Sequence, residues 1–455
     1  MGRQLHLNLF IHGRGHHEAS WRHSDASLLP LTDIRYYQDL AQRAEGALFD
    51  SIFLADQLAL GGDVTQAPRT WLEPITVLAA IAVATSRVGL IATASTTYTE
   101  PFNLARQFAS IDHISNGRAA WNVVTTWLAT AAENYGGAGQ VNHADRYARG
   151  DEFMAVVNDL WDSWAADAVI DDRASGLYAR RERIRPINHR GDLYEVAGPL
   201  NMPRCPQGRP VLVQAGSSDT GRRFAARYAD AVFTAHMAKA TAQEFYADLK
   251  RLAAAEGRNP AHVLILPGLS PMIASTETEA RQLTREVNDL TDPVVGRKRL
   301  SGRFGGHDFS QLPLDRPLVP EDFPDPSSVQ AARSRTEVIL NLVRRDKPTL
   351  RQLLGYLAGA RGHYVMAGTP EQVADLIEDW FMGGAADGFN IMPPLLPAQL
   401  DVFSREVIPL LQRRGLFRTE YAGTTLREHY GLPWPASAFD DPNRRVELQE
   451  FVAGV

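Results

Sequence analysis

Short apolar runs alternate along the chain with longer stretches that repeat apolar positions every three or four residues. Runs of the first kind predict buried parallel strands, and stretches of the second kind predict amphipathic helices that cover them. Eight uninterrupted strand–helix units favour a closed (β/α)8 barrel, an α/β fold of the TIM-barrel type, over an open sheet. The eight predicted strands are Leu5–Ile11, Ser51–Ala55, Val88–Thr93, Ala119–Val124, Pro210–Ala215, Ala231–Ala235, Val263–Ile273 and Gly388–Met392.

Helix starts are marked by capping signals. Thr241 and Thr276 are each followed three residues later by a glutamate, which is the capping-box pattern. Thr369 precedes Pro370, and proline is favoured at the first helical position. No Gly-x-Gly-x-x-Gly follows a predicted strand, which argues against a dinucleotide-binding domain. Periodicity predicts further helices at about 33–48, 72–85, 103–114 and 151–164.

Two long segments interrupt the series. Residues 165–209 separate the fourth and fifth strands, and residues 291–368 separate the seventh and eighth. Because long loops in a compact domain are usually lids or mobile segments, we expect the second to be a lid. The aromatic tail, residues 415–455, is expected to wrap the barrel or a partner subunit. The whole chain, 1–455, is predicted to be one domain.

Composition excludes several classes of function. The chain has 455 residues, a length that a single barrel with insertions reaches. With 47 basic and 53 acidic residues, the net charge of −6 lacks the basic excess of nucleic-acid-binding proteins. One cysteine excludes an intrachain disulfide, and neither a signal-peptide core nor a membrane-spanning apolar run is present. We therefore expect a cytoplasmic protein that binds neither nucleic acid nor membrane.

Polar residues gather where the predicted strands end, and in a barrel these ends carry the function. The second strand stops at Asp56, and the third and fourth end in Thr- and Ser-rich segments. After the fifth strand, Gly216-Ser217-Ser218 leads into a helix. Backbone N–H groups and hydroxyls at a positive helix end form a natural phosphate cradle. A simple helix cap by Ser217 or Ser218 explains the same residues equally well.

Two groups of histidines could carry chemistry. His143 and Tyr147 are spaced by four and can face the same way, although such a pair is more often a surface feature. The first loop lacks a His-Glu-x-x-His helix or a cysteine partner, so hydrogen bonding or proton relay is favoured there and no metal is expected. Its candidate ligands are His12, His16, His17, Glu18 and His23.

Several blocks together carry a family resemblance that covers essentially the whole chain. They resemble the bacterial luciferase-like flavin monooxygenases, within them the subgroup of nitrilotriacetate monooxygenase component A and dibenzothiophene-sulfone monooxygenase. The resemblance implies a barrel that holds FMN at the carboxyl ends of its strands. The blocks are Phe53–Asp56, Thr93–Phe102, Ser115–Thr125, Gln214–Gly221 and Gly388–Gly415.

The resemblance also implies roles for individual residues. His17 and His307 become candidate catalytic residues that hydrogen-bond or protonate a flavin peroxide. Phe53 and Phe245 become candidate walls of the substrate pocket, and either is equally well explained as core. Flavin contacts are implied at Asp56, Thr93, Ser95 and Asn122 for the ring and ribityl part, and at His143, Tyr147, Ser217 and Ser218 for the phosphate.

The implied function is that of an FMNH2-dependent oxygenase. In such two-component systems a separate NAD(P)H-dependent flavin reductase supplies FMNH2, which reacts with O2 to a C4a-(hydro)peroxide that oxygenates a small organic molecule. This chemistry requires a dry, closed pocket. A homodimer or homotetramer is expected from the same resemblance.

Two other functions stay open. An FMN- or deazaflavin-dependent oxidoreductase on the same barrel would move hydride, and a non-catalytic protein would only carry flavin. The residues do not identify the substrate. The arginines of the two long segments hint at an anionic one.

Overall fold

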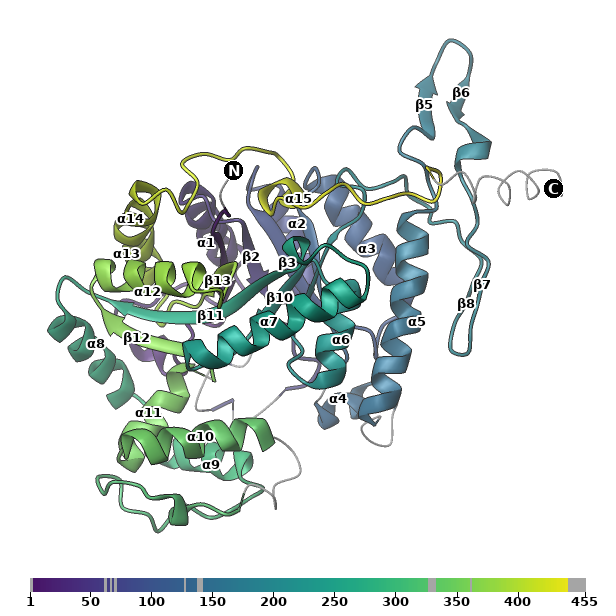
Figure 1. Ribbon diagram of the computed structural model, residues 1–455. Helices are drawn as coiled ribbons and strands as arrows, with labels where there is room; N and C mark the ends of the chain where they lie inside the picture. Colours follow the sequence, from purple (N-terminus) through teal and green to yellow (C-terminus); the bar gives the residue numbers. More distant parts are fainter. Residues whose placement is uncertain are drawn as a thin grey trace.

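Eight parallel strands close into a barrel that helices surround in this computed structural model (Figure 1). The structure describes residues 3–60, 64–65, 68, 72–126, 128–136, 142–325, 333–360 and 362–440. Each strand pairs with the next, β10 pairs with β11, and β13 pairs with β1, which closes the ring. The predicted barrel is confirmed. Its strands are β1 (His6–Ile11), β2 (Ser51–Leu54), β3 (Gly89–Ser95), β4 (Ala119–Val124), β9 (Val211–Gln214), β10 (Ala231–Thr234), β11 (Leu264–Ile273) and β13 (Gly388–Ile391).

The helices follow the predicted pattern with two corrections. α5 begins at His143, eight residues before the predicted start at 151. Capping boxes at Thr276 and Thr369 are present. The box predicted at Thr241 is wrong, because α7 begins at Lys239 and the Thr241 hydroxyl instead donates to Ala238 O at 2.9 Å. The helices around the barrel are α1 (Ile34–Gly46), α2 (Pro74–Ala82), α3 (Pro101–Ile114), α4 (Ala129–Asn134), α5 (His143–Trp161), α6 (Asp219–Tyr228), α7 (Lys239–Ala255), α8 (Glu277–Asp289), α12 (Pro370–Met382), α13 (Ala398–Val402) and α14 (Ile408–Arg413).

A further strand, β12 (Tyr364–Gly368), was not predicted. It pairs in parallel with Leu269–Ile273, the second half of β11. The first half of β11 already completes the barrel by pairing with β10. The second half therefore projects past the ring, and β12 satisfies its exposed edge.

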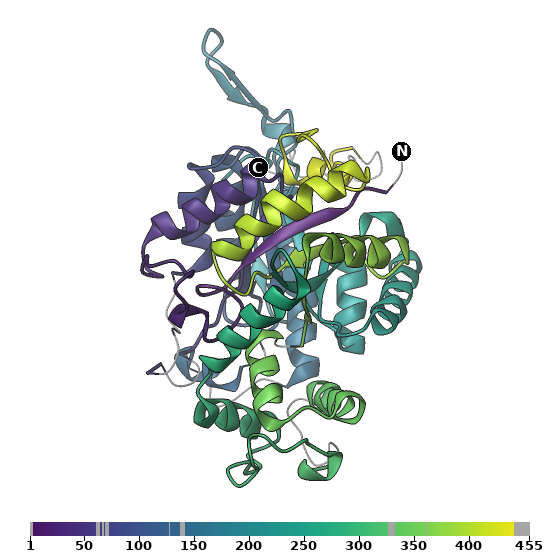
Figure 2. The same ribbon diagram turned by 90° about the vertical axis from the view of Figure 1, so that its left-hand side faces the viewer.

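The two insertions differ in structure and in place. Residues 165–209 form two hairpins, β5–β6 (Val169–Asp172, Leu177–Ala179) and β7–β8 (His189–Arg190, Glu195–Val196), which project beside α5 (Figure 1). The second insertion forms α9 (Pro293–Arg303), α10 (Arg333–Asp346) and α11 (Leu350–Ala360). Both views place α9, α10 and α11 beyond one end of the barrel (Figures 1 and 2).

The tail closes the opposite end. Leu426 and Tyr430, from and just after α15 (Leu426–His429), pack with Phe10 and Phe53 in the interior cluster of the barrel. The Tyr430 hydroxyl donates to Asn8 Oδ1 at 2.8 Å, near the start of β1. The described part of the tail thus packs on the barrel, one of the two predicted arrangements. In the described ranges, no helix has the length and apolar character of a membrane span.

Candidate active site

A polar pair lies inside the barrel near the carboxyl ends of β3 and β4. Thr93 and Asn122 are register partners, and both point inward because their strand neighbours Ile91 and Ala120 lie in the interior cluster. Asn122 Nδ2 donates to Thr93 Oγ1 at 2.8 Å. Asn122 Oδ1 is buried and accepts no hydrogen bond from any described residue. Since a buried acceptor without a donor is costly, a donor from a ligand fits here.

The segment after β3 is ordered by Ser95. Its buried Oγ accepts hydrogen bonds from Thr126 Oγ1 at 2.6 Å and from Thr97 N at 3.1 Å. Ser95 therefore joins the ends of β3 and β4 beside the Thr93–Asn122 pair. This places three of the predicted flavin contacts along one wall of the barrel mouth.

Asp56 lies half-buried directly after β2. Its Oδ1 accepts from Gln57 N at 2.8 Å, and burial raises the pKa of this carboxyl above its ordinary value. The negative charge of Asp56 adds to burial in raising the pKa of Tyr135, which stacks on Tyr98 with ring centroids 4.7 Å apart. Asp56 is thus bordered by an aromatic stack at the rim of the mouth.

Gly216-Ser217-Ser218, the predicted phosphate cradle, stands directly before α6. Ser218 caps this helix, since its Oγ accepts from Gly221 N at 3.1 Å, and Ser217 is exposed beside it. A Cβ added at Gly216 would lie 2.4 Å from Gln214 Nε2 and 3.2 Å from the Tyr147 hydroxyl. One added at Gly221 would lie 2.9 Å from the same hydroxyl. The tyrosine of α5 therefore reaches the glycines at the start of α6. The Ser218 cap is present, and phosphate binding at this place stays a prediction.

Two arginines that the sequence reasoning did not single out stand beside this cradle. Arg146 is buried and donates to Thr126 O at 2.6 Å, and Arg149 donates to Thr96 O at 3.4 Å. Both come from α5, the helix of Tyr147, and both bind the loops that follow β3 and β4. The block Asn142–Tyr147 that drew attention to Tyr147 contains Arg146 as well. His143 begins α5, and its side chain lies outside the described part of the structure.

Aromatic rings from β1, β2 and β10 lie inside the barrel. Phe53 lies 4.6 Å from Phe10 and 5.7 Å from Phe233, measured between ring centroids. His363 stacks on Phe233 at 4.9 Å, and His16 lies 4.5 Å from Phe10. Phe53 thus faces the interior of the barrel, as a pocket wall requires. The sequence did not indicate His363 as a candidate, because this residue precedes β12, the strand that was not predicted.

Phe245 lies elsewhere. It is buried in a cluster with Ala225 and Val232, which belongs to the helices and strands on the outer side of the barrel wall. Its ring also lies 5.2 Å from that of His236. The packing corresponds to the core interpretation of Phe245, and the structure does not bring it together with Phe53.

His17 is held by the end of α8, just before the second insertion. Nδ1 accepts from Ala19 N at 3.2 Å, which leaves the proton on Nε2, and Nε2 donates to Asn288 Oδ1 at 3.0 Å. Burial lowers the pKa of His17 to about 4. Both ring nitrogens are therefore occupied, so a role on the flavin requires Nε2 to leave Asn288.

His307 lies apart from His17. It is exposed in the segment after α9, and its ring contacts Phe309 at 4.7 Å. Among the contacts of the described residues, none joins His307 to His17 or to the Thr93–Asn122 pair. The catalytic roles of both histidines stay predictions.

Fold and site together define a flavin-dependent monooxygenase. The family model described as "Luciferase-like monooxygenase" matches residues 13–387, and the chain belongs to this family. The resemblance found in the sequence is therefore confirmed.

Individual relatives match along nearly the whole chain. N-acetyl-S-(2-succino)cysteine monooxygenase of Bacillus subtilis (strain 168) is 46% identical, over 96% of this chain and 98% of the relative. Nitrilotriacetate monooxygenase component A of Aminobacter aminovorans is 45% identical, over 97% and 99%. The structure of riboflavin lyase with modified FMN and riboflavin has a TM-score of 0.81 and 31% identity, and covers 98% of this chain and 99% of its own.

Proposed function

We propose that the protein is the oxygenase component of a two-component system that uses FMNH2 and O2 to oxygenate a small organic anion. A separate NAD(P)H-dependent flavin reductase would supply the FMNH2. Both relatives described above are named for compounds that carry several carboxylates, which supports an anionic substrate class. A cytoplasmic location and a homodimer or homotetramer stay predictions.

One observation carries the proposal. The Tyr147 hydroxyl lies against Gly216 and Gly221 at the start of α6, where a Cβ on either glycine would come within 3.2 Å of it. The backbone N–H groups at a helix start and the positive end of the helix dipole favour a phosphate. On β4, the strand beside β9, the buried Asn122 Oδ1 accepts no hydrogen bond from any described residue. A phosphate at one end and hydrogen-bond donors at the other are what FMN presents, so the residues fit this cofactor.

Reduced FMN, when bound, supplies the electrons that activate O2 for transfer of one oxygen atom to the substrate. The chain would bind the phosphate with Tyr147, Ser217, Ser218 and the side chain of His143. Asp56, Thr93, Ser95 and Asn122 would contact the rest of the flavin along the β2–β4 wall. Phe53 and the other rings would exclude water from the mouth. Oxygenation by reduced flavin requires such a dry pocket.

The test of the cradle is the variant Gly216→Ala. Its Cβ would meet Gln214 Nε2, so we expect anaerobic titration to show FMNH2 binding weakened about tenfold, which corresponds to about 1.4 kcal/mol. Gly46→Ala is the matched control, since nothing lies within 4 Å of a Cβ there. Equal FMNH2 affinity in the two variants would show that the flavin does not use this cradle.

The oxygenase assignment is tested with a generic flavin reductase and a panel of substrates. The expected result is oxygenated product with little release of hydrogen peroxide for at least one substrate. A protein that binds FMNH2 yet only releases hydrogen peroxide with every panel member, or that reduces a substrate without O2, would contradict it.

A further inference from the structure

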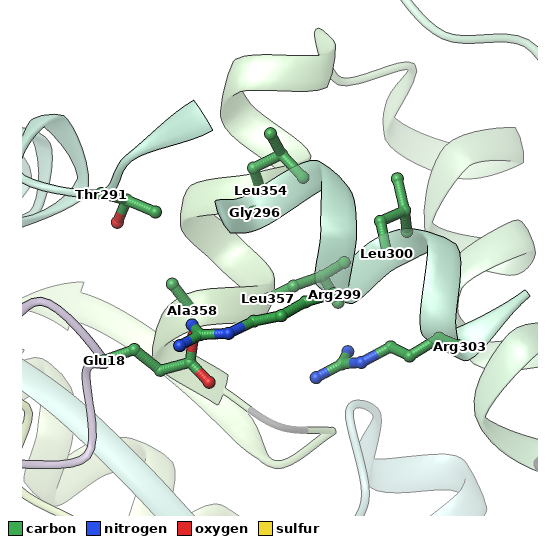
Figure 3. Close-up of a pocket in the computed structure, with 9 residues that line it drawn as sticks. All are labelled: Glu18, Thr291, Gly296, Arg299, Leu300, Arg303, Leu354, Leu357 and Ala358. Carbon is green, nitrogen blue, oxygen red and sulfur yellow. The ribbon is translucent and has the colours of Figure 1, made fainter. Parts of the chain in front are cut away.

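A small pocket lies between the first loop and the second insertion (Figure 3). Its polar lining consists of Glu18 from the loop after β1, Thr291 just before α9, and Arg299 and Arg303 of α9. Leucines of α9 and α11 supply most of its apolar lining. Glu18 is the second residue after His16, which contacts Phe10 in the mouth at 4.5 Å. The first loop therefore connects this pocket with the barrel mouth.

The charged lining contains two guanidinium groups and one carboxylate. Arg299 forms an ion pair with Glu18. Arg303, one helical turn further, points toward the same space (Figure 3). Burial lowers the pKa of Arg299, and the charge of Arg303 lowers it further. Two cations held close together in a partly buried setting favour an anion between them, because desolvation strengthens their mutual repulsion.

Thr291 adds an independent observation. Its Oγ1 is buried and makes no hydrogen bond within the part of the chain that the structure describes. A buried hydroxyl is costly unless it is hydrogen-bonded. A ligand oxygen in the pocket would accept from this hydroxyl.

We propose that this pocket binds a carboxylate group of the substrate, and that Glu18 occupies Arg299 until the substrate displaces it. Guanidinium groups bind carboxylates through two parallel hydrogen bonds, which makes arginine the side chain suited to this task. Leu354 and Leu357 would contact the carbon skeleton of the substrate. The substrate class is then a small organic di- or tricarboxylate with one carboxylate in this pocket. The proposal rests on the proposed oxygenase function.

The experiment compares Arg303→Gln with Lys298→Gln. Lys298 lies exposed on the same helix and outside the pocket, so it is a matched loss of one positive charge. Calorimetry on the flavin-free protein measures binding of N-acetyl-S-(2-succino)cysteine, of nitrilotriacetate and of the neutral trimethyl ester of the first compound. We expect the wild type to bind at least one acid and not the ester. Arg303→Gln should weaken acid binding about tenfold, and Lys298→Gln by less than about twofold.

Glu18→Gln is the control for misfolding, since a misfolded variant would lose acid binding. This variant should instead strengthen acid binding several-fold, because it releases Arg299. Each of three results would overturn the pocket proposal. The wild type could bind the ester as tightly as the acid, or it could bind neither acid. The third result is that Arg303→Gln and Lys298→Gln bind the acid with equal affinity. Anaerobic FMNH2 titration of the same proteins keeps the two proposals separate. If the proteins bind FMNH2 but do not distinguish the acid from the ester, only the pocket proposal fails. If the wild type does not bind FMNH2, the proposed oxygenase function fails.

Discussion

The two insertions look alike in the sequence and differ in what they bury. Residues 165–209 form hairpins whose Leu177, Tyr178 and Leu193 are exposed, and hydrogen bonds anchor the insertion at its root and at the turn of β7–β8. The second insertion has a cluster of its own, in which Leu300, Phe309 and Leu354 are almost fully buried.

Among the residues that the structure describes, the second insertion and the end of α8 just before it contact the first loop at the barrel mouth. Asn288, at the end of α8 where this insertion begins, accepts from His17, and Ala358 O accepts from Glu18 N at 3.0 Å. Met237, just after β10, packs against its cluster. Segment length and arginine content therefore do not tell whether an insertion covers the mouth. The apolar residues of an insertion determine whether it covers the mouth, because only a segment with a core of its own can hold a fixed position over the site.

The largest effect is expected for Phe309→Ala in the second insertion. Phe309 is 1% exposed and packs against Phe304 and Phe323. Removal of a buried phenyl ring costs about 3–5 kcal/mol, and here it falls on a cluster separate from the barrel. We expect an early unfolding transition and increased hydrogen peroxide release per FMNH2, with FMNH2 affinity nearly unchanged. Phe309→Leu should be much milder, and unchanged coupling in Phe309→Ala would show that the insertion does not shield the site.

The second prediction concerns acid stability. The pKa of His17 is about 4 in the folded protein and about 6.5 when unfolded. Its contribution is therefore complete above about pH 6.5 and is lost as the pH falls toward 4, because only the unfolded state binds the proton in that window. The total is about 3 kcal/mol. Denaturant unfolding of His17→Gln should show a shallower pH dependence between pH 6.5 and 4, and parallel curves would contradict the assignment.

Much of this architecture could be predicted from the sequence. Buried parallel strands are continuous apolar runs, so all eight barrel strands were found. The places of Thr93, Ser95 and Asn122 near strand ends could be predicted from the strand pattern, whereas their flavin contacts come from the family resemblance and stay predictions. β12 was missed because it is short and mostly half-buried, and it follows a long insertion.

Other features depend on contacts that sequence patterns do not contain. Glu18 and Arg299 are far apart in the sequence and form an ion pair. Only the packing of α9 against the first loop brings them together. Phe245 fits a helical stripe whether it lines a pocket or a core, so its periodicity could not separate the two. Thr241 satisfies the capping-box spacing, yet its hydroxyl bonds within an α7 that starts earlier.

A smaller effect is expected where the first insertion is anchored. The Glu152 carboxylate of α5 accepts from Tyr194 N at 2.8 Å, from Leu193 N at 3.0 Å and from His189 Nε2 at 3.2 Å. Glu152→Gln keeps one acceptor oxygen and loses the charge, which should cost about 1–2 kcal/mol. Hydrogen exchange should show faster opening of β7–β8. Hydrogen peroxide release should not change, and an increase would show that this insertion shields the site as well.

The smallest effect is expected in the other hairpin, on its strand β6. Tyr178 is 61% exposed on β6, so Tyr178→Ser should change the free energy of unfolding by less than about 0.5 kcal/mol. Coupling of FMNH2 oxidation to product should equal that of the wild type, since this hairpin projects away from the mouth (Figure 1). Thermal unfolding and the hydrogen peroxide assay used for Phe309→Ala provide the measurement. Uncoupling by Tyr178→Ser would remove the distinction between the two insertions, because an exposed side chain on a hairpin without a core would then control the site.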